Sequence, residues 1–461
     1  MGTPPDTNAT ELAAARLVGL RGRGPAPDPP LAAAPVSARG AGSKHYHGGP
    51  QEQPAMEGLR LVAAVIVVVF HCQAVSADIR GGGPAGMWLV RTGYFSVDAL
   101  FVLSGFAQFL PFAAAGPDRR QDWRGYAIRR ALRIVPAYYV ALVLTGLYIG
   151  HFSLGAGHSG HTVGVWELLI HATFLHHVFY GVGGQVGLGI DTAMWTLTAE
   201  AAFYIVLPFV ARRFLRHPLV GLGVGLVVAL AWRGFAFLVA GAHDPTEYVV
   251  SQAPAFAFHF ALGMAAAVLA VRLRGMVAAG GELARRIRWV GVFGVVYGAG
   301  ALFAWQRAAD PAHHNFSQHY ALFDRYIWNP VPTLAFALLI VALAVAPRWS
   351  YWPLANPIAR WMGEATYGTY LLHILVMLEL AREWKALGHH PLPLWQIGGL
   401  TVVESILLGR LSFMLVEEPA RRLARILAAR WASPSFRPDR QPTRSPPRGA
   451  PRARLARWGA D

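Results

Sequence analysis

The sequence predicts an all-α fold: a polytopic transmembrane helical bundle of about ten spans with disordered N- and C-terminal tails. Three observations support this class. Hydrophobic residues make up 54% of the 461-residue chain and charged residues only 14%, and the mean hydropathy is +0.36. Apolar segments of spanning length recur from residue 59 to residue 417. Arginine-rich segments lie between them, as in multi-pass membrane proteins.

Each candidate span is close to the ~20 residues that a helix needs to cross ~30 Å of hydrocarbon. A further apolar run, 165–181, is short and carries Glu167 and three histidines. The candidate spans are 59–77, 87–112, 130–150, 194–214, 219–241, 254–272, 289–305, 329–347, 366–382 and 394–417.

The arginines predict the topology. The basic connections are 119–133, 211–217, 271–288, 347–360 and the segment after Glu418. With about ten spans they all fall on one side, which is the cytoplasm by the positive-inside rule. We therefore expect a multi-pass protein of the cell membrane with both termini in the cytoplasm. If 165–181 also crossed, 211–217 would move outside, so 165–181 is predicted to be a re-entrant or outward-facing helix.

The two ends of the chain differ in composition from the part between them. Residues 1–55 are rich in Pro, Gly and Ala without helical periodicity, and 423–461 form a basic, Pro-rich tail; both are predicted to be disordered. Residues 56–422 form the membrane domain. The formal charge of +16 is concentrated between spans, so it indicates a lipid bilayer as partner and no nucleic acid. The single cysteine, Cys72, excludes an intrachain disulfide.

The first span holds an ionisable pair. Arg60 and His71 are eleven residues apart, which advances a helix by ~16.5 Å and returns the chain to nearly the same face. One interpretation is an arginine that extends to the interface and a neutral histidine bonded to a carbonyl. Because polar groups at this depth usually face a cavity or a partner, the pair also suggests a site with a cation at its mouth and a titratable base within.

A second pair of cations opens the third span. Arg130 and Arg133 have the spacing i, i+3, which places them on one helix face at the cytoplasmic edge. They are either positive-inside anchors or a clamp for phosphate.

Other polar residues lie at membrane depth. Glu200 is about two turns from the outer surface, at a depth similar to that of His71, and a carboxylate there is a natural orienter of an imidazole. Tyr367 and Tyr370 are typical of interfacial tyrosines, and His373 is typical of a buried histidine with a satisfied hydrogen bond.

The histidines outside the spans do not predict a metal site. Their spacings fit no established ligand pattern and no acidic partner stands at a fixed offset, so no metal is expected. They are His151, His158, His161, His171, His176, His177, His313, His314 and His319.

Several stretches together resemble acyltransferase family 3, a group of integral membrane O-acyltransferases, over residues 56–422. The chain departs from the family at Met194 and Thr196, which flank Trp195, and at Ala365-Thr366, where a serine is common. The stretches are EGLR with a histidine eleven residues after its arginine, FSVDALFVLSGF, RRALRIVPAYY, MWTLTAEAAFYIVLP, MGEATYGTYLLH and SFMLVEEPARRL.

The resemblance implies an acyl-CoA donor, usually acetyl-CoA, and a hydroxyl acceptor on a carbohydrate, a cell-surface glycan or a secondary metabolite. It maps the family's Arg-x10-His motif onto Arg60 and His71, and its Arg-x2-Arg motif onto Arg130 and Arg133.

The hypothesis that follows gives each candidate a role. His71 is the general base on the acceptor and Glu200 orients it, while the three arginines hold the CoA phosphates. An acyl-histidine intermediate stays open, as does an acceptor in the cytoplasm. The alternative function is a polytopic transporter or flippase without acyl-transfer chemistry.

Overall fold

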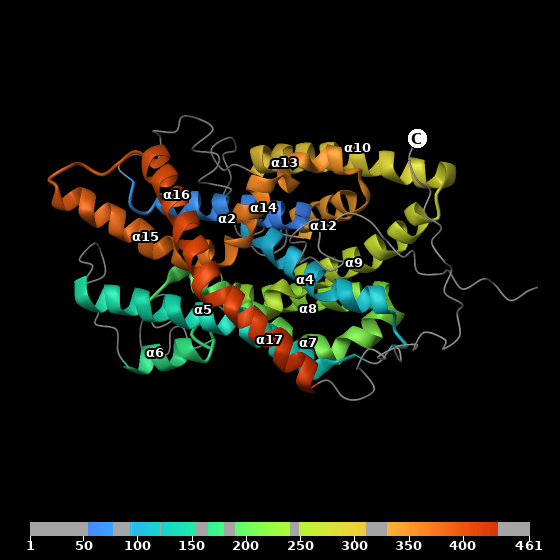
Figure 1. Cartoon of the computed structure of the whole chain (residues 1–461), viewed down its shortest axis with the longest axis horizontal. Coiled ribbons are helices and arrows are strands. Elements are labelled where there is room, and N and C mark those ends of the chain that lie inside the picture. Colours follow the sequence, from blue (N-terminus) through green and yellow to red (C-terminus); the bar gives the residue numbers. More distant parts are fainter. Residues whose placement is uncertain are drawn as a thin grey trace, which may run out of the picture. The chain divides into compact units, whose positions relative to one another are not determined.

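The computed structural model describes most of the chain between residues 54 and 431 (Figure 1). By contacts the chain forms two units, residues 1–50 and 51–461, and every described residue belongs to the second. The predictions for residues 1–53 and 432–461 lie outside the described residues. The described residues are 54–76, 93, 95–119, 121–152, 165–178, 190–239, 249–309 and 330–431.

Every regular element in these ranges is a helix, which confirms the predicted all-α class. The longer helices are α2 (Pro54–Cys72), α4 (Phe95–Ala115), α5 (Trp123–Phe152), α7 (Trp195–Arg216), α8 (Pro218–Val239), α9 (Ala257–Ala278), α10 (Gly281–Ala309), α12 (Pro330–Val345), α15 (Thr366–Ala386), α16 (Leu394–Ser412) and α17 (Glu418–Trp431). Short helical elements are α6 (Val165–Ala172), η2 (Thr192–Met194), η4 (Ala253–Phe256), η7 (Arg348–Tyr351), α13 (Trp352–Ala355), α14 (Pro357–Glu364) and a π-helical turn, η8 (Phe413–Glu417).

Each predicted span overlaps one of these helices, but they differ in their ability to cross a bilayer. Among the described residues, seven helical segments are long and apolar enough to do so. The helices at the other three predicted spans, α10, α12 and α15, are not among these seven segments, and α12 has only 16 residues. The seven segments are Pro54–Cys72, Phe95–Ala115, Trp123–Tyr148, Thr192–Arg216, Pro218–Val239, Ala253–Ala278 and Leu394–Trp431.

Two segments refine the predicted boundaries. The apolar run at 165–181 contains α6, which has 8 residues and is therefore ~12 Å long, too short to cross. At the other end, α17 continues to Trp431, so helix extends into the segment that composition places in the C-terminal tail. Glu417 and Glu418 each bond an arginine four residues later, at 3.1 and 2.9 Å, which supports this helix.

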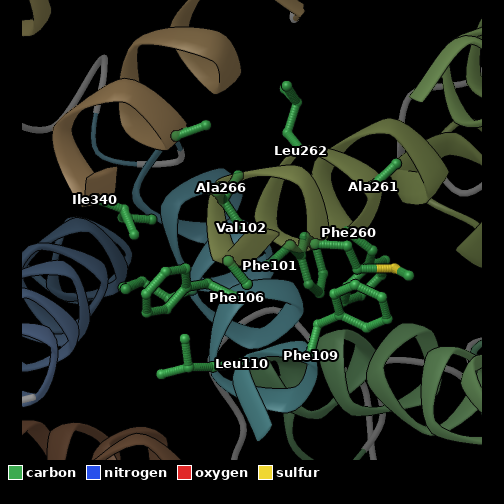
Figure 2. Close-up of a cluster of buried hydrophobic side chains, with 14 of the residues drawn as sticks. Phe101, Val102, Phe106, Phe109, Leu110, Phe260, Ala261, Leu262, Ala266 and Ile340 are labelled. Atoms are coloured by element: carbon green, nitrogen blue, oxygen red, sulfur yellow. The ribbon is translucent and has the colours of Figure 1, made fainter. Parts of the chain in front are cut away.

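The core of the membrane domain is the contact between α4 and α9. Figure 2 shows Phe101 and Phe109 of α4 on the side of Phe260 of α9, and the rings of Phe101 and Phe260 are 5.3 Å apart. The two backbones approach closely because Gly263 of α9 lies against α4: a Cβ there would overlap the Val102 carbonyl oxygen. Small residues at such crossings allow membrane helices to pack tightly.

Contacts between basic connections support the predicted topology. Arg216, at the end of α7, lies 3.4 Å from Asp118, which follows α4. Arg274 of α9 donates to the carbonyl oxygen of Ala344 near the end of α12, at 2.9 Å. The arginine-rich segments at 119–133 and 211–217 therefore lie on the same side of the helices, as do those at 271–288 and 347–360.

Candidate active site

A cavity of about 110 Å³ lies among five helices that are far apart in the sequence: α2, α4, α5, α7 and α15. Four of the five site residues predicted from the sequence line it: Arg60, Arg130, Arg133 and Glu200. The fifth, His71, does not. The remaining lining residues are Ala64, Val97, Leu100, Phe101, Ser104, Ala107, Gln108, Ile134, Thr196, Leu197, Tyr204, Thr366, Tyr367 and Tyr370.

The three arginines reach the cavity from two helices. Arg130 and Arg133 are one turn apart on α5 and share its cavity face, as their spacing predicts, while Arg60 comes from the N-terminal half of α2. Within the described ranges, no carboxylate oxygen lies within 4.0 Å of any of the three guanidinium groups. By contrast, their neighbour Arg129 points away from the cavity and pairs with Asp122 at 3.8 Å.

These charges make the cavity a site for an anion. Three guanidinium groups face a single lining carboxylate, Glu200, and that carboxylate already accepts a hydrogen bond from the Tyr204 hydroxyl at 2.7 Å. Clustered cations in a partly desolvated space repel one another, so a bound anion relieves that repulsion. Guanidinium groups also match the geometry of phosphate oxygens. Gln108, only 4% exposed, adds a buried amide oxygen with no protein partner among the described residues.

Glu200 does not meet His71, contrary to the predicted arrangement. Its hydrogen-bond partner is Tyr204, one turn later on α7. Similar depth was not enough to predict a contact: α2 packs beside α4, α15 and α16, and α7 packs beside α4 and α8, but α2 and α7 make no extensive contact with each other in the described part of the chain. Similar depth does not make two helices neighbours.

The partner of His71 is His373. Its Nε2 lies 3.0 Å from Nδ1 of His71, and the ring centroids are 5.0 Å apart. On the other side of the His373 ring, Nδ1 lies 2.6 Å from the carbonyl oxygen of Tyr370. His373 is fully buried, whereas His71 is half-buried. The sequence indicated a buried histidine at 373 with a satisfied hydrogen bond, but it did not indicate that His373 forms a hydrogen bond with His71.

Tyr370 joins the histidine pair to the cavity. Its ring lines the cavity, its hydroxyl donates to the Ala193 carbonyl at 3.1 Å, and that hydroxyl is 2.9 Å from the Thr196 hydroxyl. Tyr367 lines the same cavity and donates to the Ile134 carbonyl at 3.0 Å. Both tyrosines therefore belong to the interior of the bundle, and neither is an interfacial belt residue. A sequence signal was present: Tyr370 and His373 are one turn apart in the stretch TYGTYLLH.

The histidines outside the spans, where they are described, are packing residues. His176 and His177 are buried, and burial lowers the pKa of His177 to about 4, which keeps it neutral at physiological pH. His171 stacks on His176 with ring centroids 4.4 Å apart. In the described part of the chain, no group of three or more His, Cys, Asp or Glu side chains is placed to hold a metal ion.

The chain is similar in sequence to several known proteins. The family model described as an acyltransferase domain matches residues 53–410. Nodulation protein 10 of Rhizobium leguminosarum bv. viciae is 26% identical over 396 residues, which cover 81% of this chain and 94% of that protein. Acyltransferase MdmB of Streptomyces mycarofaciens is 28% identical over 401 residues, covering 80% of this chain and 92% of that protein.

A longer relative is also similar. Peptidoglycan O-acetyltransferase OatA of Listeria monocytogenes is 22% identical over 390 residues, which cover 80% of this chain and 56% of that protein. No solved structure matches the chain.

Proposed function

This chain belongs to the acyltransferase domain family, and from that premise we propose that it transfers an acetyl group from acetyl-CoA to a hydroxyl of a carbohydrate, a cell-surface glycan or a secondary metabolite. The observation that carries the proposal is the cavity with three arginines, for which the described residues provide no carboxylate within 4.0 Å. It has the charge and the donor geometry that the phosphates of a CoA nucleotide need. The relative named as a peptidoglycan O-acetyltransferase supports a carbohydrate hydroxyl as acceptor.

In this mechanism Arg60, Arg130 and Arg133 bind the phosphates at the cytoplasmic end of the bundle. His71 is ~16.5 Å further along α2, a distance that the pantetheine arm of CoA can span. The arm would pass Tyr370, which lines the cavity and whose carbonyl oxygen accepts a hydrogen bond from His373. The arginines thereby position the thioester, and positioning is a large part of the catalysis of acyl transfer.

The chemical step moves the acetyl group from the sulfur of CoA to the hydroxyl oxygen of the acceptor. His71 takes the proton of the acceptor hydroxyl, and the oxygen attacks the thioester carbonyl. The new C–O bond forms, the C–S bond breaks, and the imidazolium returns the proton to the CoA thiolate. A neutral imidazole suits this task because its ordinary pKa is near the working pH.

The decisive experiment compares wild-type protein with His71→Ala in a reconstituted membrane. In the wild type we expect transfer of the acetyl group to an added acceptor with release of CoA thiol, and in the variant a rate that is lower by about 10²–10⁴-fold. Thermal stabilisation by CoA should be the same in both proteins, because the phosphate site is intact. Full transfer by His71→Ala would remove this histidine from the mechanism.

The acceptor can be identified in cells. Mass spectrometry of surface glycans and secreted products should show an O-acetyl ester that is lost when the gene is deleted. If the wild-type protein is not stabilised by CoA and instead moves an unmodified solute across vesicles, the transporter or flippase alternative is correct.

A further inference from the structure

We propose that His373 is a positioning residue that fixes the tautomer and the orientation of the His71 imidazole, so that Nε2 of His71 carries the lone pair that receives the acceptor's proton. The inference rests on the proposed function and assigns to His373 the role that the sequence suggested for Glu200. Four observations lead to it, beginning at the buried end of the chain of hydrogen bonds.

The Tyr370 carbonyl determines the state of His373. A carbonyl oxygen only accepts hydrogen bonds, so the ring nitrogen that lies 2.6 Å from it, Nδ1, must carry hydrogen. A neutral imidazole has one N–H, and His373 is fully buried, where the neutral form is favoured. Its Nε2 is therefore an acceptor.

The acceptor nitrogen of His373 then determines the state of His71. Nδ1 of His71 is 3.0 Å from that nitrogen, so the hydrogen in this bond belongs to His71. The Val67 carbonyl, one turn earlier on α2, is a further acceptor for the same imidazole. In a helix it is Nδ1, the nitrogen nearer the main chain, that reaches such a carbonyl, as Nδ1 of His171 reaches that of Glu167 at 2.8 Å. Both acceptors favour hydrogen on Nδ1 of His71.

The remaining nitrogen of His71 is left available. In the described part of the chain, Nε2 of His71 makes no hydrogen bond to protein, and the residue is half-buried rather than enclosed. A general base needs this state: a lone pair that is directed outward on a ring that cannot turn away.

The hydrogen bond between His71 and His373 also suits the imidazolium form that His71 adopts during the reaction. When His71 takes a proton at Nε2, its Nδ1–H bond to His373 becomes a charge-assisted hydrogen bond, which is stronger than the neutral one. His373 itself need not change its protonation. The elements packed around the pair contribute no carboxylate contact to either ring among the described residues, so the neutral His373 is the group that supports the charge.

The test separates the role of His373 as a hydrogen-bond acceptor from the volume that its side chain fills. In His373→Gln, the side-chain carbonyl oxygen can replace Nε2 as the acceptor, whereas His373→Leu fills similar volume without an acceptor. We expect His373→Leu to lower kcat by about 10²-fold with little change in KM for acetyl-CoA, and His373→Gln to recover most of that loss. His176→Leu, which changes another fully buried histidine, is the control for packing and should keep wild-type kcat.

A second readout does not depend on catalysis. Nitrogen NMR of ring-labelled histidine, with the His71 signals assigned by their loss in His71→Ala, reports which nitrogen is protonated. We expect hydrogen on Nδ1 of His71 in the wild-type protein and in His373→Gln. Hydrogen on Nε2 in the wild type, or an unchanged kcat in His373→Leu, would overturn the proposal. If the wild-type protein shows the expected tautomer but transfers no acyl group, the proposed function fails while the hydrogen-bonded arrangement stands.

Discussion

At the scale of single residues, the cavity assigns distinct tasks to arginines that look equivalent in the sequence. Arg129 and Arg130 are adjacent in an arginine-rich segment, and both satisfy the positive-inside rule. Arg129 is half exposed and pairs with Asp122, whereas Arg130 faces the cavity and has no carboxylate partner among the residues that the structure describes. Only the second is available for a ligand.

This difference gives a matched pair of variants. We expect Arg130→Gln to weaken CoA binding by about 10- to 100-fold, because a charge-assisted hydrogen bond contributes roughly 1.5–3 kcal/mol. Arg129→Gln should leave the affinity within about twofold, since an exposed ion pair contributes little. The measurement is isothermal titration with CoA in detergent. Equal losses in both variants would show that the arginines act only through overall charge.

At the scale of elements, the site depends on how closely helices approach. Because Phe101 and Ser104 of α4 line the cavity, the position of α4 sets its shape. That position is determined largely by α9, which contacts α4 along the core. A Cβ at Gly263 of α9 would lie 2.6 Å from the backbone nitrogen of Phe106, closer than side-chain atoms pack.

Two glycines of the same helix test this contact. We expect Gly263→Ala to destabilise the protein by about 1–3 kcal/mol, because the helices must separate to admit the methyl group. Gly275→Ala, also in α9, meets no atom within 4 Å and should be neutral or slightly stabilising, because alanine favours helix. Thermal unfolding of the purified proteins measures both. Equal melting temperatures for the two variants would contradict a tight α4–α9 contact.

At the scale of the whole molecule, the distribution of arginine orients the bundle. The Arg216–Asp118 contact joins the basic connections after α4 and α7, and the Arg274–Ala344 contact joins those after α9 and α12, so each pair lies on one side. We propose that this side faces the cytoplasm. Acyl-CoA is made there, so it could enter the arginine-lined cavity directly.

Cysteine labelling tests the orientation. The only natural cysteine, Cys72, is fully buried and can be replaced by serine. In that background, Asp118→Cys should react with a membrane-impermeant maleimide only from the cytoplasmic side. Leu387→Cys, in a connection predicted to be outside and 68% exposed, should react only from the outer side. Labelling of both from one side would show that the predicted topology is wrong.

The sequence by itself determined the helical membrane class, the face shared by Arg130 and Arg133, and the candidate pair Arg60 and His71. Periodicity and depth are local properties of a helix, set by 3.6 residues per turn and 1.5 Å per residue, so they can be computed from spacing alone. Arginines between apolar segments likewise report which side of the membrane each connection faces.

Only the tertiary structure decided which side chains meet. It joined Glu200 to Tyr204 and His71 to His373, and it brought arginines of α2 and α5 around one cavity with Tyr370 of α15. The physical reason is that the lateral order of helices depends on contacts between residues far apart in the chain, such as Gly263 against Val102. No local pattern encodes that order, because similar apolar surfaces can pack beside several neighbours.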